Sequence, residues 1–374
     1  MIAYSRKIKR KIFAAFLIIL VAVLTIPAHA AGPEEIAAEQ ENAAGVDRLK
    51  RSARQLGGTA EYGDSLEDGL SKLLKDGIGI VGTAARTAIS SGLSILIVVF
   101  FCGVGETVYQ TADSKKQSFI PLAGAVAVAA VAIADVDSML GLGRNSIETM
   151  ASFANVLLPV IASVTAATGA VTGAAVRQMA AVLFSDLLIN LIQRLLIPLL
   201  YGYMAVSIAG AAIGNEGLKK IGGFLKWLTT TMLTTVMLAF VGYLTVSGVV
   251  AGSADAMTIK ATKFAISSAI PVVGGILSDA AETILVSTGI LRGSVGVFGM
   301  VTILGMCLAP LLRMAVHYLA YKLVGAVSST VSAGALSTLV DQLGSAFGLM
   351  MGMTGACCLL LLVSLVSSIT AVSI

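Results

Sequence analysis

The residues of this chain that could do chemistry are charged side chains inside long apolar stretches. A charged group costs free energy in a hydrocarbon environment, so such residues are functional candidates by default. Asp186 lies in the middle of an apolar segment, and Asn190 follows one helical turn later on the same face. This pair predicts either a polar lining of a wet cavity or an ion pair inside a helix bundle, with Arg177, Arg194 or Arg292 as partners.

A second candidate site lies in the run KFAISSAIPVVGGILSDAAET. Pro271 removes a backbone donor and disfavours helix before it, and Gly274 and Gly275 each weaken a helix further. We therefore expect a helix break at membrane depth, where protein or water must satisfy the backbone. Asp279 and Glu282 would then lie near the positive amino-terminal end of a new helix. The alternative is an amphipathic helix on the membrane surface with a loop.

Sequence motifs for catalysis and cofactor binding are missing. The chain has no P-loop, no H-E-x-x-H and no G-x-S-x-G. Its four cysteines lie in apolar runs without a C-x-x-C pair, which favours small buried hydrophobic side chains over a metal or disulfide site. The net charge of +4 comes without any nucleic-acid-binding motif. We expect no enzymatic activity, no cofactor, no metal and no nucleic-acid partner.

The composition requires a lipid environment for these residues. Hydrophobic residues make up 57% of the 374 and charged residues 12%, against roughly one half and one quarter in soluble domains. Such a surface cannot be solvated by water, and the apolar fraction also excludes a disordered chain. The fold class predicted is an all-α, polytopic membrane helix bundle.

The amino-terminal part of the chain divides into two segments ahead of a membrane domain at 78–374. Residues 1–30 have a basic start, an apolar core and an Ala28-His29-Ala30 cleavage pattern, which predicts a cleavable signal peptide; an uncleaved anchor is the alternative. Residues 31–77 are polar, and we expect them outside the cytoplasm with a short helix near 35–56. This segment is either a solvated tether or a docking arm for a partner.

The membrane domain contains seven clear candidate spans, because a span needs about 20 apolar residues. They cover 87–104, 119–136, 150–176, 195–214, 227–252, 293–312 and 347–369. Lysines 115, 116, 219, 220 and 226 should all face the cytoplasm, which requires that the ambiguous segment 177–194 also penetrates the membrane. We therefore expect seven or eight spans. Arg86, Asp135 and Arg313 lie near span ends and should reach to the interface.

Small residues and prolines recur within this domain. Five G-x-x-x-G pairs, at 169/173, 210/214, 248/252, 289/293 and 348/352, favour closely packed helices. Pro159 and Pro271 are 112 residues apart, and so are Pro198 and Pro310. This common offset indicates a candidate internal repeat of residues 150–214 and 262–326, with coincidence among seven prolines as the alternative.

The run KFAISSAIPVVGGILSDAAETI, followed by GSVGVFGMVTIL and APLLR, resembles the stage III sporulation protein AE family. The resemblance implies a permease-like membrane subunit of a sporulation-specific channel or secretion complex between mother cell and forespore. It also implies a location in the mother-cell membrane around the forespore. The implied partners are the other stage III sporulation A proteins, including an AAA-type ATPase, and stage II sporulation protein Q. A stand-alone secondary transporter and a structural membrane scaffold are the alternative functions.

Overall fold

The structure, a computed structural model, describes the backbone of residues 33–58, 60–112, 119–167, 171–269, 274–331 and 334–370. Side chains are described over 39–58, 60–108, 119–166, 179–243, 291, 293–330 and 334–366. The described chain is helical and contains no strand, which confirms the all-α bundle. Residues 1–30 lie outside the described part, so the signal peptide stays a prediction.

Two short helices precede the bundle, α2 (Pro33–Ala44) and α3 (Val46–Gln55). The single helix expected near 35–56 is divided at Gly45, whose φ of 80° lies in the left-handed region that glycine tolerates. Val46, Leu49 and Ala53 form one buried face of α3, and α3 packs against the bundle. This part of segment 31–77 is therefore docked onto the bundle rather than a free tether.

Tyr62 lies in the connection between α3 and the bundle and contacts both. Its ring meets Phe298 edge-on with the centroids 5.7 Å apart, and the Lys50 ammonium lies 3.9 Å from the centre of the Tyr62 ring. Lys50 also forms an ion pair with Glu41. Burial, and secondarily the Glu41 carboxylate, raises the pKa of the Tyr62 phenol above its usual range.

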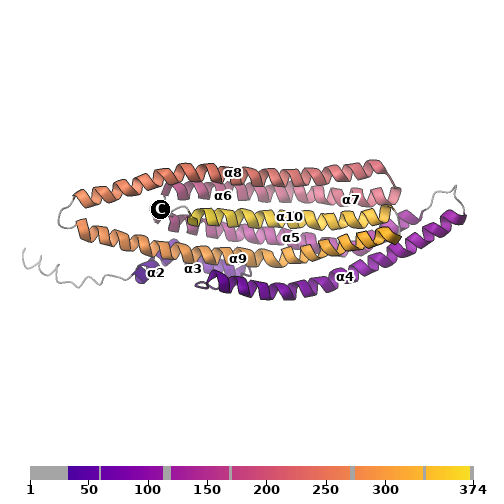
Figure 1. Cartoon of the computed structure of the whole chain (residues 1–374), viewed down its shortest axis with the longest axis horizontal. Helices are drawn as coiled ribbons and strands as arrows, with labels where there is room; N and C mark the ends of the chain where they lie inside the picture. Colours follow the sequence, from indigo (N-terminus) through magenta and orange to yellow (C-terminus); the bar gives the residue numbers. More distant parts are fainter. Residues whose placement is uncertain are drawn as a thin grey trace, which may run out of the picture.

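The bundle is built from very long antiparallel helices (Figure 1). They are α4 (Leu66–Ala112), α5 (Ile120–Ala167), α6 (Val171–Leu191), a π-helical turn η1 (Ile192–Leu196), α7 (Ile197–Ile213), α8 (Glu216–Ala269), α9 (Gly274–Val331) and α10 (Ala335–Thr370). At about 1.5 Å per residue, α5, α8 and α9 are roughly 70 to 90 Å long. A bilayer has a hydrocarbon core of about 30 Å, so large parts of these helices lie outside it.

Six of the described helices, not seven or eight, are long and apolar enough to cross a membrane. Predicted spans 119–136 and 150–176 lie largely on the single helix α5, which continues through Pro159. Segment 177–194 and predicted span 195–214 are likewise joined by η1 into one candidate crossing. Pro198 lacks the N–H that would close a regular turn there, and the π-helical turn ends two residues before it, at Leu196. The sequence interpretation divided α5 into two spans because polar residues inside a rod-like helix resemble loops.

Three connections between helices lie at the same end of the bundle (Figure 1). The α4–α5, α7–α8 and α9–α10 connections share this end, whereas α5–α6 and α8–α9 connect at the other end, where α10 also finishes. The six-helix arrangement therefore puts the ends of α4 and α7, which precede the two predicted cytoplasmic loops, on one side without an additional crossing. We call this end, with residues 213–226 and 322–341, the lysine end.

The proline segment connects two helices that run in opposite directions. Pro271 itself lies outside the described residues; α8 ends at Ala269, and Gly274 and Gly275 are the first two residues of α9. Figure 1 shows these helix ends reaching beyond the rest of the bundle, opposite the lysine end. Because Pro271 lies outside the described residues, the candidate repeat stays a prediction; Pro159 is inside α5 and Pro310 is inside α9.

Glycine allows close helix contacts, but mostly at positions other than the predicted pairs. A Cβ on Gly143 of α5 would lie 2.4 Å from Met350 Cε and 2.8 Å from its Cγ. Of the predicted pairs with described surroundings, Gly348 lies against the Tyr318 ring, whereas Gly214 ends α7 with a positive φ. The tight packing expected from glycine is present at Gly348 and, more often, at glycines outside the predicted pairs.

Candidate functional site: a lysine cluster at one end of the bundle

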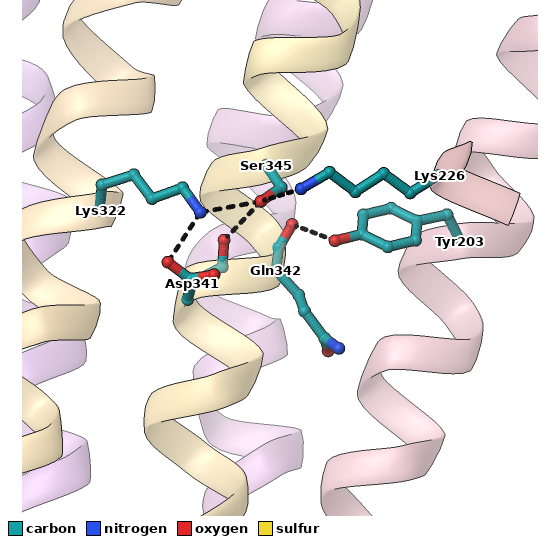
Figure 2. A network of polar contacts seen from close by, with 6 residues as sticks. All are labelled: Tyr203, Lys226, Lys322, Asp341, Gln342 and Ser345. Atoms are coloured by element: carbon teal, nitrogen blue, oxygen red, sulfur yellow. Dashed lines mark hydrogen bonds and ion pairs between the residues drawn. The ribbon is translucent and has the colours of Figure 1, made fainter. Parts of the chain in front are cut away.

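Four helices bring a group of polar side chains together near the lysine end (Figure 2). Tyr203 comes from α7, Lys226 from α8, Lys322 from α9, and Asp341, Gln342 and Ser345 from α10. Each lies within about ten residues of its helix end, and hence within roughly 15 Å of the lysine end. We call these six residues the lysine cluster.

The hydroxyl of Ser345 is the centre of the lysine cluster (Figure 2). It accepts a hydrogen bond from the Lys322 ammonium at 2.9 Å and one from the Lys226 ammonium at 3.3 Å. It donates its own hydrogen to the Asp341 backbone carbonyl at 3.1 Å. A hydroxyl has one donor and two acceptor positions, so this buried oxygen is fully satisfied.

The lysine cluster carries one more positive charge than negative charge. Lys322 forms an ion pair with Asp341, with its ammonium 2.7 Å from Asp341 Oδ1. Lys226 has only the neutral Ser345 hydroxyl as a partner among the described residues, and its side chain is exposed. Two ammoniums on one oxygen lie at most about 6 Å apart. Their repulsion is roughly 3 kcal/mol at an effective dielectric constant of about 20, and under about 1 kcal/mol in water.

Two glycines allow the approach of α9 and α10 that forms the ion pair. A Cβ on Gly325 would lie 3.2 Å from the Asp341 backbone nitrogen. A Cβ on Gly344 would lie 3.1 Å from Tyr321 Cβ and 3.4 Å from the Lys322 backbone nitrogen. Backbone atoms cannot rotate away, so a side chain at either position would push the helices apart and separate Lys322 from Asp341.

On the other side of the cluster, Tyr203 ties α7 to α10. Its buried hydroxyl donates to the Gln342 backbone carbonyl at 3.1 Å, and Ser207, one turn later, donates to the Tyr203 carbonyl at 2.7 Å. Trp227 and Phe224 of α8 are both more than half exposed, with ring centroids 5.8 Å apart. Exposed aromatic side chains beside lysines are typical of a membrane–water interface.

A second polar group is buried inside the bundle. The Tyr321 hydroxyl donates to Asp135 Oδ2 at 2.9 Å, with the tyrosine fully buried and the aspartate 7% exposed. His317, one turn before Tyr321, is also buried; its Nδ1 lies 2.9 Å from the Arg313 carbonyl oxygen, and its Nε2 has no hydrogen-bond partner among the described residues. The expectation that Asp135 reaches the interface is wrong, because α5 is continuous there and turns this residue towards α9. Arg86 and Arg313 are exposed, as expected.

The predicted polar residues do not form one site among the described side chains. Asp186 and Arg194 are both exposed and form no ion pair with each other, while Asn190 donates to the Asp186 backbone carbonyl at 2.9 Å. Asp279, Glu282 and Arg292 lie on α9, with side chains outside the described residues, as is that of Arg177. Their role stays a prediction.

The cysteines are largely buried, as expected from their positions in apolar runs. Cys307, Cys357 and Cys358 are buried, Cys102 is half-buried, and all four are free thiols. Cys307 of α9 and Cys358 of α10 have their sulfurs 2.8 Å apart. Among the described residues no three His, Cys, Asp or Glu side chains lie together as metal ligands would.

Sequence reasoning did not find the lysine cluster, whose charges come from three different helices. Lys226 and Ser345 are 119 residues apart, and Tyr321 and Asp135 are 186 residues apart. The available signal was Lys322 and Asp341 on either side of the α9–α10 turn, 19 residues apart, with Gly325 and Gly344 beside them.

The comparisons with known proteins identify a family that covers most of the bundle. The model of the family described as stage III sporulation protein AE matches residues 66–372, which includes the lysine cluster and all six candidate spans. A relative with that name from Bacillus subtilis (strain 168) is 24% identical over 202 residues, 54% of this chain. The match spans about half the relative, 51% of its length, and no solved structure matches. The chain belongs to the stage III sporulation protein AE family, and it is a membrane protein of sporulation.

Proposed function

We propose that this chain is the permease-like membrane subunit of a sporulation-specific channel or secretion complex between mother cell and forespore. The observation that carries the proposal is the family match over a bundle of six candidate spans. The proposed location is the mother-cell membrane around the forespore, with the lysine end in the cytoplasm according to the positive charge of its turns. The proposed partners are the other stage III sporulation A proteins and stage II sporulation protein Q.

Two features of the chain support a role within a larger assembly. The sequence has no P-loop, so an AAA-type ATPase among the partners would supply energy. Helix α4 exposes Leu66, Leu70, Leu74 and Ile78 in one stripe, with charged residues such as Glu67 and Lys75 beside it. An apolar stripe with charged edges is typical of a surface that another helix covers.

Deletion of the gene tests the proposal. We expect vegetative growth to be unchanged and sporulation to stop after engulfment, with rescue by the wild-type chain. Tagged protein from sporulating cells should co-purify with the ATPase and with stage II sporulation protein Q. Normal spore numbers in the deletion strain would contradict the proposal.

A stand-alone secondary transporter is the second candidate function, and the buried Asp135–Tyr321 pair favours it. A carboxyl group inside a membrane bundle is typical of ion and proton pathways. This function predicts ion-driven solute uptake by the purified protein in liposomes, with loss in Asp135→Asn. Uptake that requires the partner proteins would instead favour the channel subunit.

A further inference from the structure

We propose that the lysine cluster binds the phosphate headgroup of an anionic phospholipid, with Lys226 as the residue that contacts the phosphate. The proposal concerns this chain alone and is independent of the assembly in which the chain works. Three observations carry it: the unbalanced charge of the cluster, its position along the bundle, and the apolar side chains beside it.

The charge of the cluster selects an anionic ligand. Asp341 neutralises one ammonium, Lys322, at 2.7 Å, and no described carboxylate lies within ion-pair distance of Lys226. The Lys226 ammonium uses one of its three hydrogens on Ser345, so two remain for a ligand. An ammonium is a common phosphate ligand in proteins, and a phosphate bound there would also relieve the repulsion between the two lysines.

The position of the cluster selects a ligand that belongs to the membrane. Lys226 is ten residues from the start of α8 and Lys322 nine residues from the end of α9, which puts both about 15 Å along the helices from the lysine end. Trp227 and Phe224 neighbour Lys226 on α8, and their exposed rings are typical of the headgroup level. Basic side chains of membrane helices at this level are recognised contacts for anionic lipid headgroups.

Apolar side chains on the same turns can hold the acyl chains. Leu319 and Leu323, three residues before and one residue after Lys322, are 57% and 67% exposed. Trp227 directly follows Lys226 and is 57% exposed. A soluble phosphate would leave these apolar side chains exposed, whereas the acyl chains of a phospholipid would bury them.

Lipid binding by the purified full-length protein tests the proposal. Native mass spectrometry counts phosphatidylglycerol and phosphatidylcholine molecules retained by each chain, and a titration in detergent gives their apparent affinities. We expect phosphatidylglycerol to bind more tightly than phosphatidylcholine, and Lys226→Gln to weaken phosphatidylglycerol about fivefold or more. Lys220→Gln is the matched control, because Lys220 is an exposed lysine on the same helix outside the cluster.

A variant with the opposite sign separates binding from structural damage. Asp341→Asn removes the negative charge of the cluster and keeps a hydrogen-bond acceptor for Lys322, so phosphatidylglycerol should bind several-fold more tightly. Equal losses in Lys226→Gln and Lys220→Gln would indicate general charge attraction and overturn the site. Weaker binding in Asp341→Asn would overturn it too. Displacement by free glycerol phosphate at concentrations similar to those of the lipid would overturn the assignment to a lipid.

Discussion

Two glycines of α5, only two residues apart, give opposite predictions for the same substitution. Gly141 is exposed, and a Cβ there would meet nothing within 4 Å. Gly143 is buried, and its Cβ would lie 2.4 Å from Met350 Cε and 2.8 Å from Met350 Cγ. We expect Gly141→Ala to stabilise the protein and Gly143→Ala to destabilise it.

The magnitudes follow from two competing effects. Alanine is favoured over glycine in a helix interior by roughly 0.5–1 kcal/mol, and this gain applies to both positions. Carbon atoms prefer separations of about 3.5–4.0 Å, so the Met350 side chain must move by about 1 Å for a Cβ at Gly143. Overpacking of this kind costs about 1–3 kcal/mol. Gly143→Ala should therefore lose up to about 2.5 kcal/mol, whereas Gly141→Ala should gain up to about 1 kcal/mol.

Thermal unfolding in detergent measures this difference. Cys307 and Cys357 are buried, so in a Cys102→Ser background we expect a thiol-specific dye to react only when the bundle opens and to report the transition. Met350→Ala makes room for the new methyl group, so the Gly143→Ala penalty should become smaller in that background. Equal shifts for Gly141→Ala and Gly143→Ala, or an unchanged penalty with Met350→Ala, would refute the close approach of α5 and α10.

Three further predictions test other parts of the structure. Mild oxidation should link Cys307 to Cys358, whose sulfurs are 2.8 Å apart, and the link is detected as thiol loss and altered gel mobility. Loss of the link in Cys358→Ser but not in Cys357→Ser would confirm the pairing of α9 and α10. Tyr321→Phe leaves the Asp135 carboxyl without its tyrosine donor and should lower the free energy of unfolding by about 1–3 kcal/mol, measured by thermal unfolding. An equal loss in the control Tyr318→Phe would contradict a specific hydrogen bond. Because the folded protein raises the pKa of the Tyr62 phenol, its contribution to stability is complete below the ordinary tyrosine pKa of about 10 and is lost as the pH rises further. Tyr62→Phe should remove this alkaline loss of stability, and an identical pH profile for the variant would contradict the assignment.

The lysine cluster and the buried Asp135 show why the polar sites could not be read in full from the sequence. Sequence analysis identified polar residues inside apolar stretches, and it correctly regarded them as unusual. It assumed loops where the helices continue, so it placed Asp135 at a span end and counted two crossings in α5. A helix that crosses a bilayer can continue beyond it into water. In the sequence, polar residues on the part outside the bilayer cannot be distinguished from those of a loop.

The sequence by itself determined the environment of this protein and its family. An apolar fraction of 57% requires lipid, the spacing of the apolar stretches requires helices, and the run after Lys263 identifies the family. Only the tertiary structure decided that six rods form the bundle, that α4 and α7 end on the same side, and that Lys226, Lys322, Asp341 and Ser345 meet. The physical reason is that composition and periodicity act locally along the chain. The charge balance of a site depends on which helix faces approach, and here glycines at 325 and 344 set that approach.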